Sequence, residues 1–229
     1  MGNFARFRKV YRLIGIRGVL KSLWFNLRYV PMPLSMKFPV ILSPDVEIRN
    51  CRRGAIVFRG GVTGCMSIGF GDLEYAPHKK SMLNLKGTLI VNGKGFHNFA
   101  SGTILYVGEG ATAEFGNKFS CSHDCKFYIR KGLKVGDDNM WSYYNVVMDN
   151  DGHPIFNDRN EVINPNKEVV FGDKVWMGCR CTVLKGVNVP DNTVIATNSL
   201  VNKSPNQSGC IIASSRVLKD DIHWERTLL

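Results

Sequence analysis

The chain has 229 residues, of which 44% are apolar and 21% charged, and its formal net charge is +11. This composition fits a globular protein and excludes a low-complexity chain. No apolar stretch reaches the roughly 18 residues of a membrane span, and the seven cysteines show no paired spacing, so we expect reduced thiols in a cytoplasmic protein.

The positive charge is concentrated at the front of the chain. Residues 1–60 hold 12 Lys and Arg against Asp45 and Glu47, a balance of +10, so the rest of the chain is nearly neutral. Nucleic-acid binding needs such a charge, but no recognisable nucleic-acid-binding module accompanies it. We therefore expect no nucleic-acid partner.

A basic helical segment is predicted over residues 1–38. Residues 4–29 mix apolar positions at roughly helical spacing with seven cations and no acid. Gly15 and Gly18 each cost about 1 kcal/mol relative to Ala inside a helix, so two short helices are expected rather than one long helix. A segment of this kind covers an open end of the domain that follows, lies through residues 1–30 on an anionic membrane surface as a peripheral contact, or does both.

Short strands are predicted after this segment. The stretches VEIRNCRRGAIVF and MLNLKGTLIVNG alternate like strands without a fixed longer period, so the first part of the region is expected to be irregular. From Phe115 a six-residue unit appears in FGNKFS, CSHDCK, VGDDNM and WSYYNV. The step from Phe127 to Val135 is eight residues rather than six, which predicts a bulge or a longer corner.

The six-residue unit becomes regular between Phe171 and Val201. Its first position is always apolar and its fifth is small or β-branched, whereas its second position holds residues that tolerate tight corners. One large and one small inward side chain plus a corner describe one side of a triangular coil, whose turns of about 18 residues stack as parallel strands. The first positions are Phe171, Met177, Val183, Val189, Ile195 and Val201, and the fifth are Val175, Cys181, Val187, Thr193 and Ser199.

The repeat is interrupted by a loop near residues 148–169, and loops of this length in a compact repeat are usually functional. The loop contains His153 between a glycine and a proline. A neutral imidazole can take a proton from a substrate hydroxyl, although a loop histidine that only caps a turn fits the same pattern. Asp149 and Asp151 are near enough in sequence to hold the other ring nitrogen.

The ordered motifs GHPI, GDKVWMG and NSLVNK carry a family resemblance. From Phe115 to Lys203 the chain resembles the left-handed parallel β-helix, or hexapeptide-repeat, acyltransferases, and is similar to galactoside, maltose and capsular-polysaccharide O-acetyltransferases. The resemblance implies an all-β left-handed parallel β-helix over residues 39–205, with the loop inserted in it. It also implies that residues 206–229, as a short helix or a tail, help to bind CoA.

The resemblance implies a set of residues for each substrate. In relatives an amide side chain helps to hold the acceptor, and Asp124 stands at that place here. Tyr143 and Tyr144 can stack on a pyranose ring, or are ordinary surface tyrosines. The residues that would meet acetyl-CoA are Trp176 at the pantetheine arm, Cys179 and Thr197 through their backbone groups, and Asn202, Lys203, Arg216 and Lys219 at the phosphates.

The sequence CSHDC invites a metal-binding interpretation. Cys121 and Cys125, however, fall in the inward first and fifth positions, where a thiol acts as a small apolar side chain. Carbonic anhydrases of the same fold need three converging histidines with a close pair, and His97, His123 and His153 are 26 and 30 residues apart. We therefore expect no metal.

Together these features predict an acetyl-CoA-dependent O-acetyltransferase that acts on a hydroxyl of a sugar or glycan in bacterial surface polysaccharide synthesis, with His153 as general base. The resemblance implies a homotrimer with sites between subunits. Two alternatives stay open. One is an N-acyltransferase on an amino sugar, and the other is a catalytically silent glycan-binding scaffold.

Overall fold

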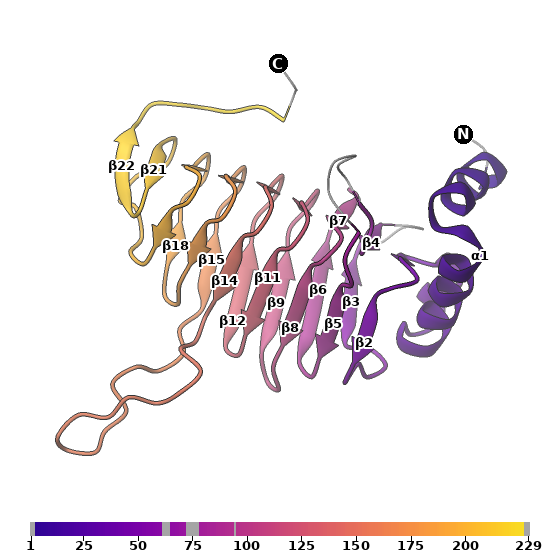
Figure 1. Cartoon of the computed structure of the whole chain (residues 1–229), viewed down its shortest axis with the longest axis horizontal. Helices are drawn as coiled ribbons and strands as arrows, with labels where there is room; N and C mark the ends of the chain where they lie inside the picture. Colours follow the sequence, from indigo (N-terminus) through magenta and orange to yellow (C-terminus); the bar gives the residue numbers. More distant parts are fainter. Residues whose placement is uncertain (1–2, 61–64, 72–77, 94, 227–229) are drawn as a thin grey trace.

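The computed structural model describes residues 3–60, 65–71, 78–93 and 95–226, with side chains from residue 15 onward. Its strands stack along one elongated body, with a helix across one end and a long insert projecting near the other (Figure 1). The body is a prism with three faces, each a sheet, which we call sheets A, B and C in the order in which the chain visits them.

Within each sheet the strands are hydrogen-bonded to their neighbours in chain order. Sheet A contains β1 (Val40–Leu42), β4 (Met66–Ile68), β7 (His97–Phe99), β10 (Ser120–Cys121), β13 (Met140–Trp141), β16 (Trp176–Met177), β19 (Val194–Ile195), β21 (Ile211–Ala213) and β22 (Arg216–Lys219). Sheet B contains β2 (Glu47–Arg49), β5 (Met82–Leu85), β8 (Ile104–Val107), β11 (Lys126–Ile129), β14 (Val146–Met148), β17 (Thr182–Val183) and β20 (Leu200–Val201). Sheet C contains β3 (Ile56–Arg59), β6 (Thr88–Asn92), β9 (Thr112–Phe115), β12 (Gly132–Val135), β15 (Val169–Phe171) and β18 (Asn188–Val189).

The predicted six-residue unit is confirmed. Every first-position and fifth-position residue from Phe171 to Val201 is buried, and the strands pair in parallel with their counterparts one turn away, as Phe171 does with Val189. Burial of each large first-position side chain contributes about 1.5–3 kcal/mol, and only the neighbouring turns provide that burial. The period of the sequence is therefore a stacking period.

The corners are made by the fourth position of the unit, so the expectation that the second position supplies them is wrong. Lys174, Arg180, Asn192 and Asn198 have φ between 52° and 63°, in the left-handed region. The glycines at the second position, Gly172 and Gly178, are explained instead by close approach between turns. A Cβ atom at Gly178 would lie 2.7 Å from the backbone nitrogen of Thr197 on the next turn.

The earlier turns are longer than 18 residues, as predicted. Phe115 pairs with Val135, and Val40 pairs with Met66, so the register there advances by 20 and 26 residues. The longer corner expected before Val135 is present at Arg130 and Lys131, between β11 and β12. These two residues matter below because their backbone amides hold the insert.

Helix α1 (Asn3–Tyr29) is interrupted at Gly15, whose φ of 60° and ψ of 178° are not helical. The prediction of two helices is therefore confirmed, with the break at Gly15, while Gly18 remains inside the second helix. Helix η1 (Leu34–Lys37) follows. The membrane contact predicted for residues 1–30 falls partly on residues 1–2 and on the side chains of residues 3–14, which lie outside the described part.

The second half of α1 covers the open edge of sheet A. Asn26 donates to the carbonyl of Val40 at 2.7 Å and accepts from its N–H at 3.1 Å. Ser22 accepts from the N–H of Leu42 at 2.9 Å. Because β1 is the first strand of its sheet, these side chains satisfy backbone groups that a further strand would otherwise pair. The structure thus shows the covering role that was one of the two predicted for this segment.

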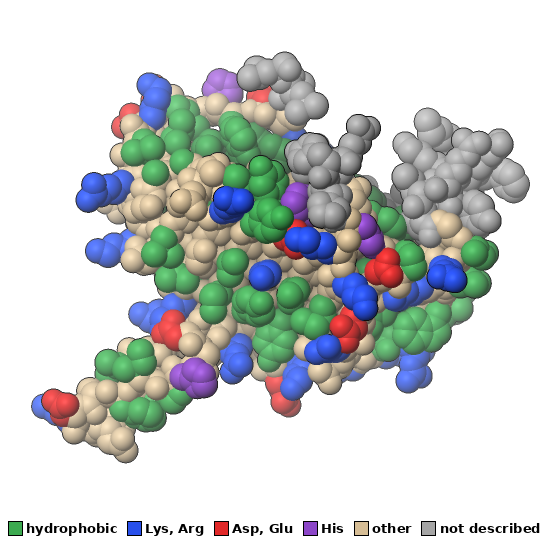
Figure 2. All heavy atoms as spheres, viewed as in Figure 1, with side chains coloured by type: hydrophobic (Ala, Val, Ile, Leu, Met, Phe, Trp, Pro, Cys, Tyr) green, Lys and Arg blue, Asp and Glu red, His purple; other side chains and the backbone are tan. Residues whose placement is uncertain are grey.

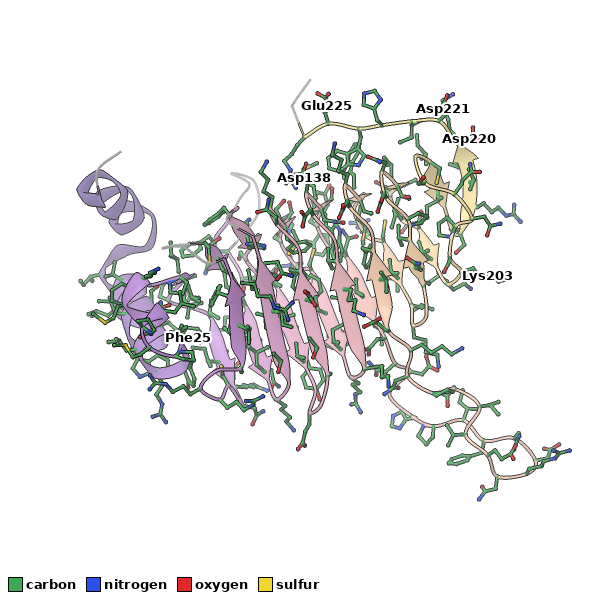
Figure 3. All side chains as sticks on the ribbon, turned by 180° about the vertical axis from the view of Figure 1, so that it is seen from behind. Phe25, Asp138, Lys203, Asp220, Asp221 and Glu225 are labelled. Atoms are coloured by element: carbon green, nitrogen blue, oxygen red, sulfur yellow. The ribbon has the colours of Figure 1, made fainter. Side chains whose placement is uncertain are left out.

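The C-terminal segment is extended, which decides between the predicted short helix and tail for the described residues. Strand β22 returns antiparallel to β21, and residues 220–226 then run back along the outside of the prism as a strap. Figure 3 shows the strap between Asp221 and Glu225, with Asp138 beneath it. Arg226 anchors the strap by bonding Asp138 at 3.0 Å and the carbonyl of Lys118 at 3.0 Å.

The fold is a left-handed parallel β-helix, as predicted. Within the described part of the chain, no helix combines the length and apolar character that crossing a bilayer requires. The boundaries 1–38, 39–205 and 206–229 remain a prediction.

Candidate functional site

The insert leaves the prism between β14 and β15, at the corner between sheets B and C. At its start Asp149 is fully buried, and its carboxylate accepts hydrogen bonds from the backbone amides of Arg130, Lys131 and Gly132 at 2.6–3.0 Å. Its carbonyl accepts from Lys167 N–H at 3.0 Å, so Asp149 joins the two ends of the insert. The prediction that Asp149 holds the His153 ring is corrected, because this carboxylate is engaged with backbone.

Asp151 forms a second anchor instead of holding the imidazole. Its carboxylate accepts from Lys185 Nζ on the next turn and from Asn164 Nδ2 at 2.8 Å. These hydrogen bonds, led by that from Lys185, lower the pKa of Asp151. Asn164 also donates to the carbonyl of His153 at 2.9 Å, so it fixes the backbone that carries the ring. The sequence prediction missed Asn164 and Lys185, because their roles appear only when the turns stack.

His153 is exposed on the insert. Among the described residues, no side chain of this protomer hydrogen-bonds its ring, whereas its backbone is fixed through Asn164. Further along the insert Phe156 and Val162 form an antiparallel bridge. The backbone that carries the imidazole is therefore held in place, and both ring nitrogens are without a hydrogen bond from the described side chains.

The insert also carries apolar side chains that the prism does not cover. Figure 2 shows them on the projecting arm, away from the body of the molecule. They are more than half exposed, which is unusual for a cluster of this size on a slender arm. These side chains are Ile155, Phe156, Val162 and Ile163.

A charged cluster occupies the corner between sheets A and B, here called the A–B corner. Asp124 Oδ2 lies 2.8 Å from Lys79 Nζ and 3.0 Å from His123 Nδ1. Burial raises the pKa of Asp124, but the hydrogen bonds from Lys79 and His123 outweigh it, and the pKa lies below its usual range. The sequence predicted Asp124 here, whereas His123 was considered only as a metal ligand and Lys79 was missed.

The two predicted tyrosines belong to the same A–B corner. The Tyr143 ring stacks on His123, with centroids 5.0 Å apart and planes at 2°. Lys79 Nζ and Arg180 Cζ lie 5.2 Å and 5.9 Å from the Tyr144 ring centroid, within cation–π range. Tyr144 itself has a left-handed φ of 61°, as the corner requires. Aromatic faces beside cations make this corner suited to a polar ring-shaped ligand.

Trp176 is 39% exposed on sheet A, and a residue of the same chain lies against it. Trp224 of the strap lies beside it, with ring centroids 6.0 Å apart. The strap is held there because Trp224 Nε1 donates to the carbonyl of Lys174 at 2.5 Å. The sequence contained no signal for this pairing, since 48 residues separate the two rings.

Four of the remaining predicted residues lie in two pairs. Cys179 Sγ lies 3.6 Å from Thr197 Oγ1, one turn apart at the A–B corner. At the far end of the prism Ser215 Oγ accepts from the backbone N–H of Asn202 at 3.0 Å and of Lys203 at 3.3 Å. The Lys203 side chain projects outward there, as Figure 3 shows.

Ser215 lies in the turn of the β21–β22 hairpin, next to two of the predicted phosphate ligands. Arg216 and Lys219, both exposed, are the first and last residues of β22. Through the hydrogen bonds of Ser215, the hairpin turn lies beside the second predicted pair, Asn202 and Lys203. The cations suit phosphate groups, and Trp176 with Trp224 suits an apolar arm, so the chemistry of these residues fits a CoA thioester.

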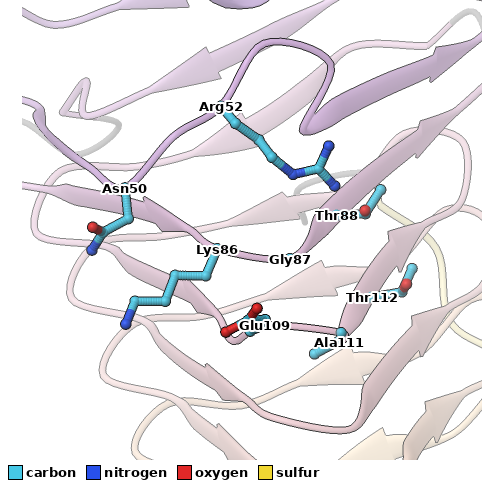
Figure 4. A pocket seen from close by; sticks show the side chains of 9 residues that line it. Asn50, Arg52, Lys86, Gly87, Thr88, Glu109, Ala111 and Thr112 are labelled. Carbon is cyan, nitrogen blue, oxygen red and sulfur yellow. The ribbon is translucent and has the colours of Figure 1, made fainter.

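The described residues also contain a hollow that lies apart from the predicted site. A polar hollow of about 580 Å³, shown in Figure 4, lies between Arg52, Lys86 and Glu109 at the corner of sheets B and C, and no predicted site residue lines it. No group of three His, Cys, Asp or Glu side chains in the described residues is placed to hold a metal ion. Cys121 and Cys125 are buried in the core, as their positions in the repeat predict.

The predicted residues thus fall on different edges of one protomer. His153 stands on the insert at the corner of sheets B and C, whereas Asp124, Tyr144 and Cys179 lie at the A–B corner. Trp176 lies on sheet A. A single protomer therefore does not bring the predicted site residues together.

No family model matches the chain. A galactoside O-acetyltransferase of Lactococcus lactis is 32% identical over 95 residues, 41% of this chain and 45% of that protein. A polysialic acid O-acetyltransferase of Neisseria meningitidis is 38% identical over 55 residues, 24% of this chain and 26% of that protein. The chain spans about half the length of the curated relatives it matches.

The crystal structure of the polySia-specific acetyltransferase NeuO superposes with a TM-score of 0.54 at 20% identity, covering 82% of this chain and 90% of that one. At this identity the likeness concerns the fold. The two sequence relatives named above are sugar O-acetyltransferases, and the fold of NeuO agrees with this one over most of both chains. The chain therefore has a left-handed parallel β-helix fold and is similar, over part of its length, to sugar O-acetyltransferases.

Proposed function

We propose that the protein is an acetyl-CoA-dependent O-acetyltransferase that modifies a hydroxyl of a sugar or glycan in bacterial surface polysaccharide synthesis. One observation carries the proposal: a rigidly anchored insert displays the exposed imidazole of His153 from a prism of the acetyltransferase fold. The names of the sequence relatives support the sugar acceptor.

In the proposed reaction His153 accepts the proton of the acceptor hydroxyl as its oxygen attacks the carbonyl carbon of the thioester. Backbone amides stabilise the oxyanion that forms. The carbon–sulfur bond then breaks, the acetyl group stays on the sugar oxygen, and the imidazolium returns its proton to the CoA thiolate. The exposed ring and its fixed backbone suit His153 to both proton transfers.

We further propose a homotrimer in which each site lies between subunits. Four apolar side chains of the insert and the unengaged ring of His153 support this assembly, because a neighbouring prism would cover the first and complete the second. His153 of one chain would then act beside Trp176 of its neighbour. Asp124, Tyr143 and Tyr144 would hold the acceptor.

The proposed donor residues divide by chemistry. Trp176 would contact the pantetheine arm, while backbone groups near Cys179 and Thr197 would satisfy its amides. The phosphates would meet Asn202, Lys203, Arg216 and Lys219 at the end of the prism, where Ser215 ties the hairpin to Asn202. These contacts would leave the thioester near the middle turns.

A cytoplasmic location is also proposed, since the seven cysteines show no paired spacing in the sequence. Burial raises the pKa of the Cys51 thiol to about 11, which keeps it protonated and unreactive. Reduced thiols of this kind suit a reducing compartment.

The test replaces His153 with Ala and measures acetyl transfer to a panel of galactosides and acidic glycans. We expect kcat to fall about 100-fold to 10,000-fold, the range for a lost general base, with an unchanged melting temperature. His78→Ala is the matched control, because His78 is also exposed and its ring is instead paired with Asp45 at 2.9 Å.

Three outcomes would contradict the proposal. Equal loss in both variants would remove the special role of His153. Transfer only to amino sugars would favour an N-acyltransferase. If CoA raises the melting temperature but no acceptor of the panel is acetylated, the protein is a glycan-binding scaffold.

A further inference from the structure

Helix α1 presents an uncovered apolar stripe on the side opposite the prism. With its inner side chains committed to β1, the helix leaves four large apolar side chains at least half exposed. At 100° per residue they fall within about 80° of the helix circumference, so they form one continuous stripe. They are Ile16, Leu20, Trp24 and Leu27, with exposed fractions of 55%, 58%, 51% and 50%.

Cations border this stripe. Around the helix axis, Arg17, Lys21 and Arg28 fall within about 40° of one another, between the apolar stripe and the buried face. Lys21 keeps its ammonium near the surface by donating to the carbonyl of Pro44 at 2.6 Å. Residues 3–29 contain no acidic side chain at all. Positive charge therefore accompanies the apolar stripe along the described part of the helix.

The same surface continues beyond the helix. Met32 and Met36 are 61% and 58% exposed, and Lys37 ends η1. Figure 2 shows apolar and basic side chains together at this end of the molecule. We call the six apolar side chains the end surface; they are Ile16, Leu20, Trp24, Leu27, Met32 and Met36.

We propose that the end surface docks on an anionic lipid bilayer, with α1 lying in the plane of the headgroups. Apolar side chains enter the boundary of the acyl chains while neighbouring Lys and Arg meet lipid phosphates. Charge complementarity favours this occupant over a second copy, because two copies meeting at this surface would bring Arg17 and Arg28 against like charges.

The fold gives this docking a direction. Helix α1 crosses the end of the prism, and the insert with the β21–β22 hairpin lies at the other end (Figure 1). A bilayer that holds α1 in its plane leaves the long axis of the prism directed away from the lipid. The faces that carry Trp176 and the A–B corner then remain open to substrates. In the proposed trimer three such ends would point the same way and bind the bilayer together.

Co-sedimentation of the full chain with vesicles tests the proposal. We expect binding to vesicles of phosphatidylcholine mixed with phosphatidylglycerol, about tenfold or more tighter than to phosphatidylcholine alone, and weakening as salt rises. Leu20→Ser with Leu27→Ser should weaken binding about tenfold or more. Arg17→Gln with Arg28→Gln should weaken it and flatten its salt dependence.

Leu218→Ser is the matched control, because Leu218 is 64% exposed on β22 at the opposite end of the prism. It should bind vesicles as the wild type does. Circular dichroism should show equal folding for all variants, since none of the substituted side chains is buried.

Vesicle binding by Leu20→Ser with Leu27→Ser at wild-type strength would overturn the proposal, as would equal loss in Leu218→Ser. If anionic vesicles do not bind the wild type and light scattering shows instead that the double variant loses a self-associated form, the end surface is an interface between copies. The readout needs no acetyl transfer, and transfer to soluble glycans needs no vesicles, so failure of this proposal is distinct from failure of the proposed function.

Discussion

Asp149 illustrates how much of a residue's role depends on the neighbouring turn of the prism. In sequence it is a carboxylate four residues before His153, which suggested a contact with the imidazole. In the structure it accepts from three consecutive backbone amides that a longer corner supplies. A buried carboxylate is stable only when its oxygens are satisfied in this way. Asp149 is thus a positioning residue for the insert.

His97 is a second buried polar residue, and it predicts a pH dependence. Its ring is fully buried, with Nε2 2.6 Å from the carbonyl of Gly116. Burial lowers the pKa of His97, only partly offset by its backbone hydrogen bonds. As pH falls, the His97 ring therefore takes up a proton earlier in the unfolded chain than in the folded chain. The contribution of His97 to the free energy of unfolding is complete above about pH 6.5 and decreases below that pH.

We expect the free energy of unfolding of the wild type to fall more steeply below about pH 6.5 than that of His97→Gln, whose amide can still donate to the Gly116 carbonyl. Urea denaturation at a series of pH values measures both slopes. The control is Arg28→Gln, an exposed substitution that keeps every histidine of the chain. Parallel slopes for His97→Gln and the wild type would refute the interpretation.

At the scale of elements, the strands were predictable and their borders were less so. The first and fifth positions of the repeat identified the buried residues from Phe171 to Val201, because burial follows the period directly. The corners were assigned to the wrong position, since Lys174 and Arg180 carry no glycine-like signal for a left-handed φ. The contacts of Ser22 and Asn26 were equally hidden, because a polar residue in a helix gives no indication of which backbone it meets.

Those contacts make a prediction for α1 as a cover of β1. Asn26→Ala removes two buried hydrogen bonds to Val40 and leaves its N–H and carbonyl unpaired, so we expect a loss of about 2–4 kcal/mol in the free energy of unfolding. Chemical denaturation measures it, and size-exclusion chromatography should reveal association through the uncovered strand. Arg28→Ala, on the exposed side of the helix, should change stability by less than about 0.5 kcal/mol.

At the scale of the whole molecule, the fold class and the place of the insert followed from the repeat and its interruption. The assembly of the site did not, because it depends on which edge of the prism each residue reaches. His153 and Trp176 lie on different parts of one protomer, and no one-dimensional pattern reports that separation. The pairing of Trp176 with Trp224 was hidden for the same reason.

Hybrid assemblies test whether the site is shared between subunits. His153→Ala and Trp176→Ala are each expected to be nearly inactive at low acetyl-CoA. Co-expression of the two chains should restore about a quarter of the wild-type activity, because one pairing in four joins an intact His153 to an intact Trp176. Mixing the separately purified proteins is the control and should restore none while the trimers do not exchange chains. Hybrids without activity would mean that both residues serve the same protomer.

The antiparallel direction of β22 affects whether further copies of the chain can extend the stack of strands. A pile of similar parallel rungs offers each new rung the same template, which is the geometry by which cross-β fibres elongate. Strand β22 runs antiparallel to β21 and has a cation at each of its ends. The edge that it offers to another copy therefore lacks the direction that a further parallel strand in sheet A needs. The hairpin therefore terminates propagation, and it allows a sequence with fibre-like order to remain a discrete particle.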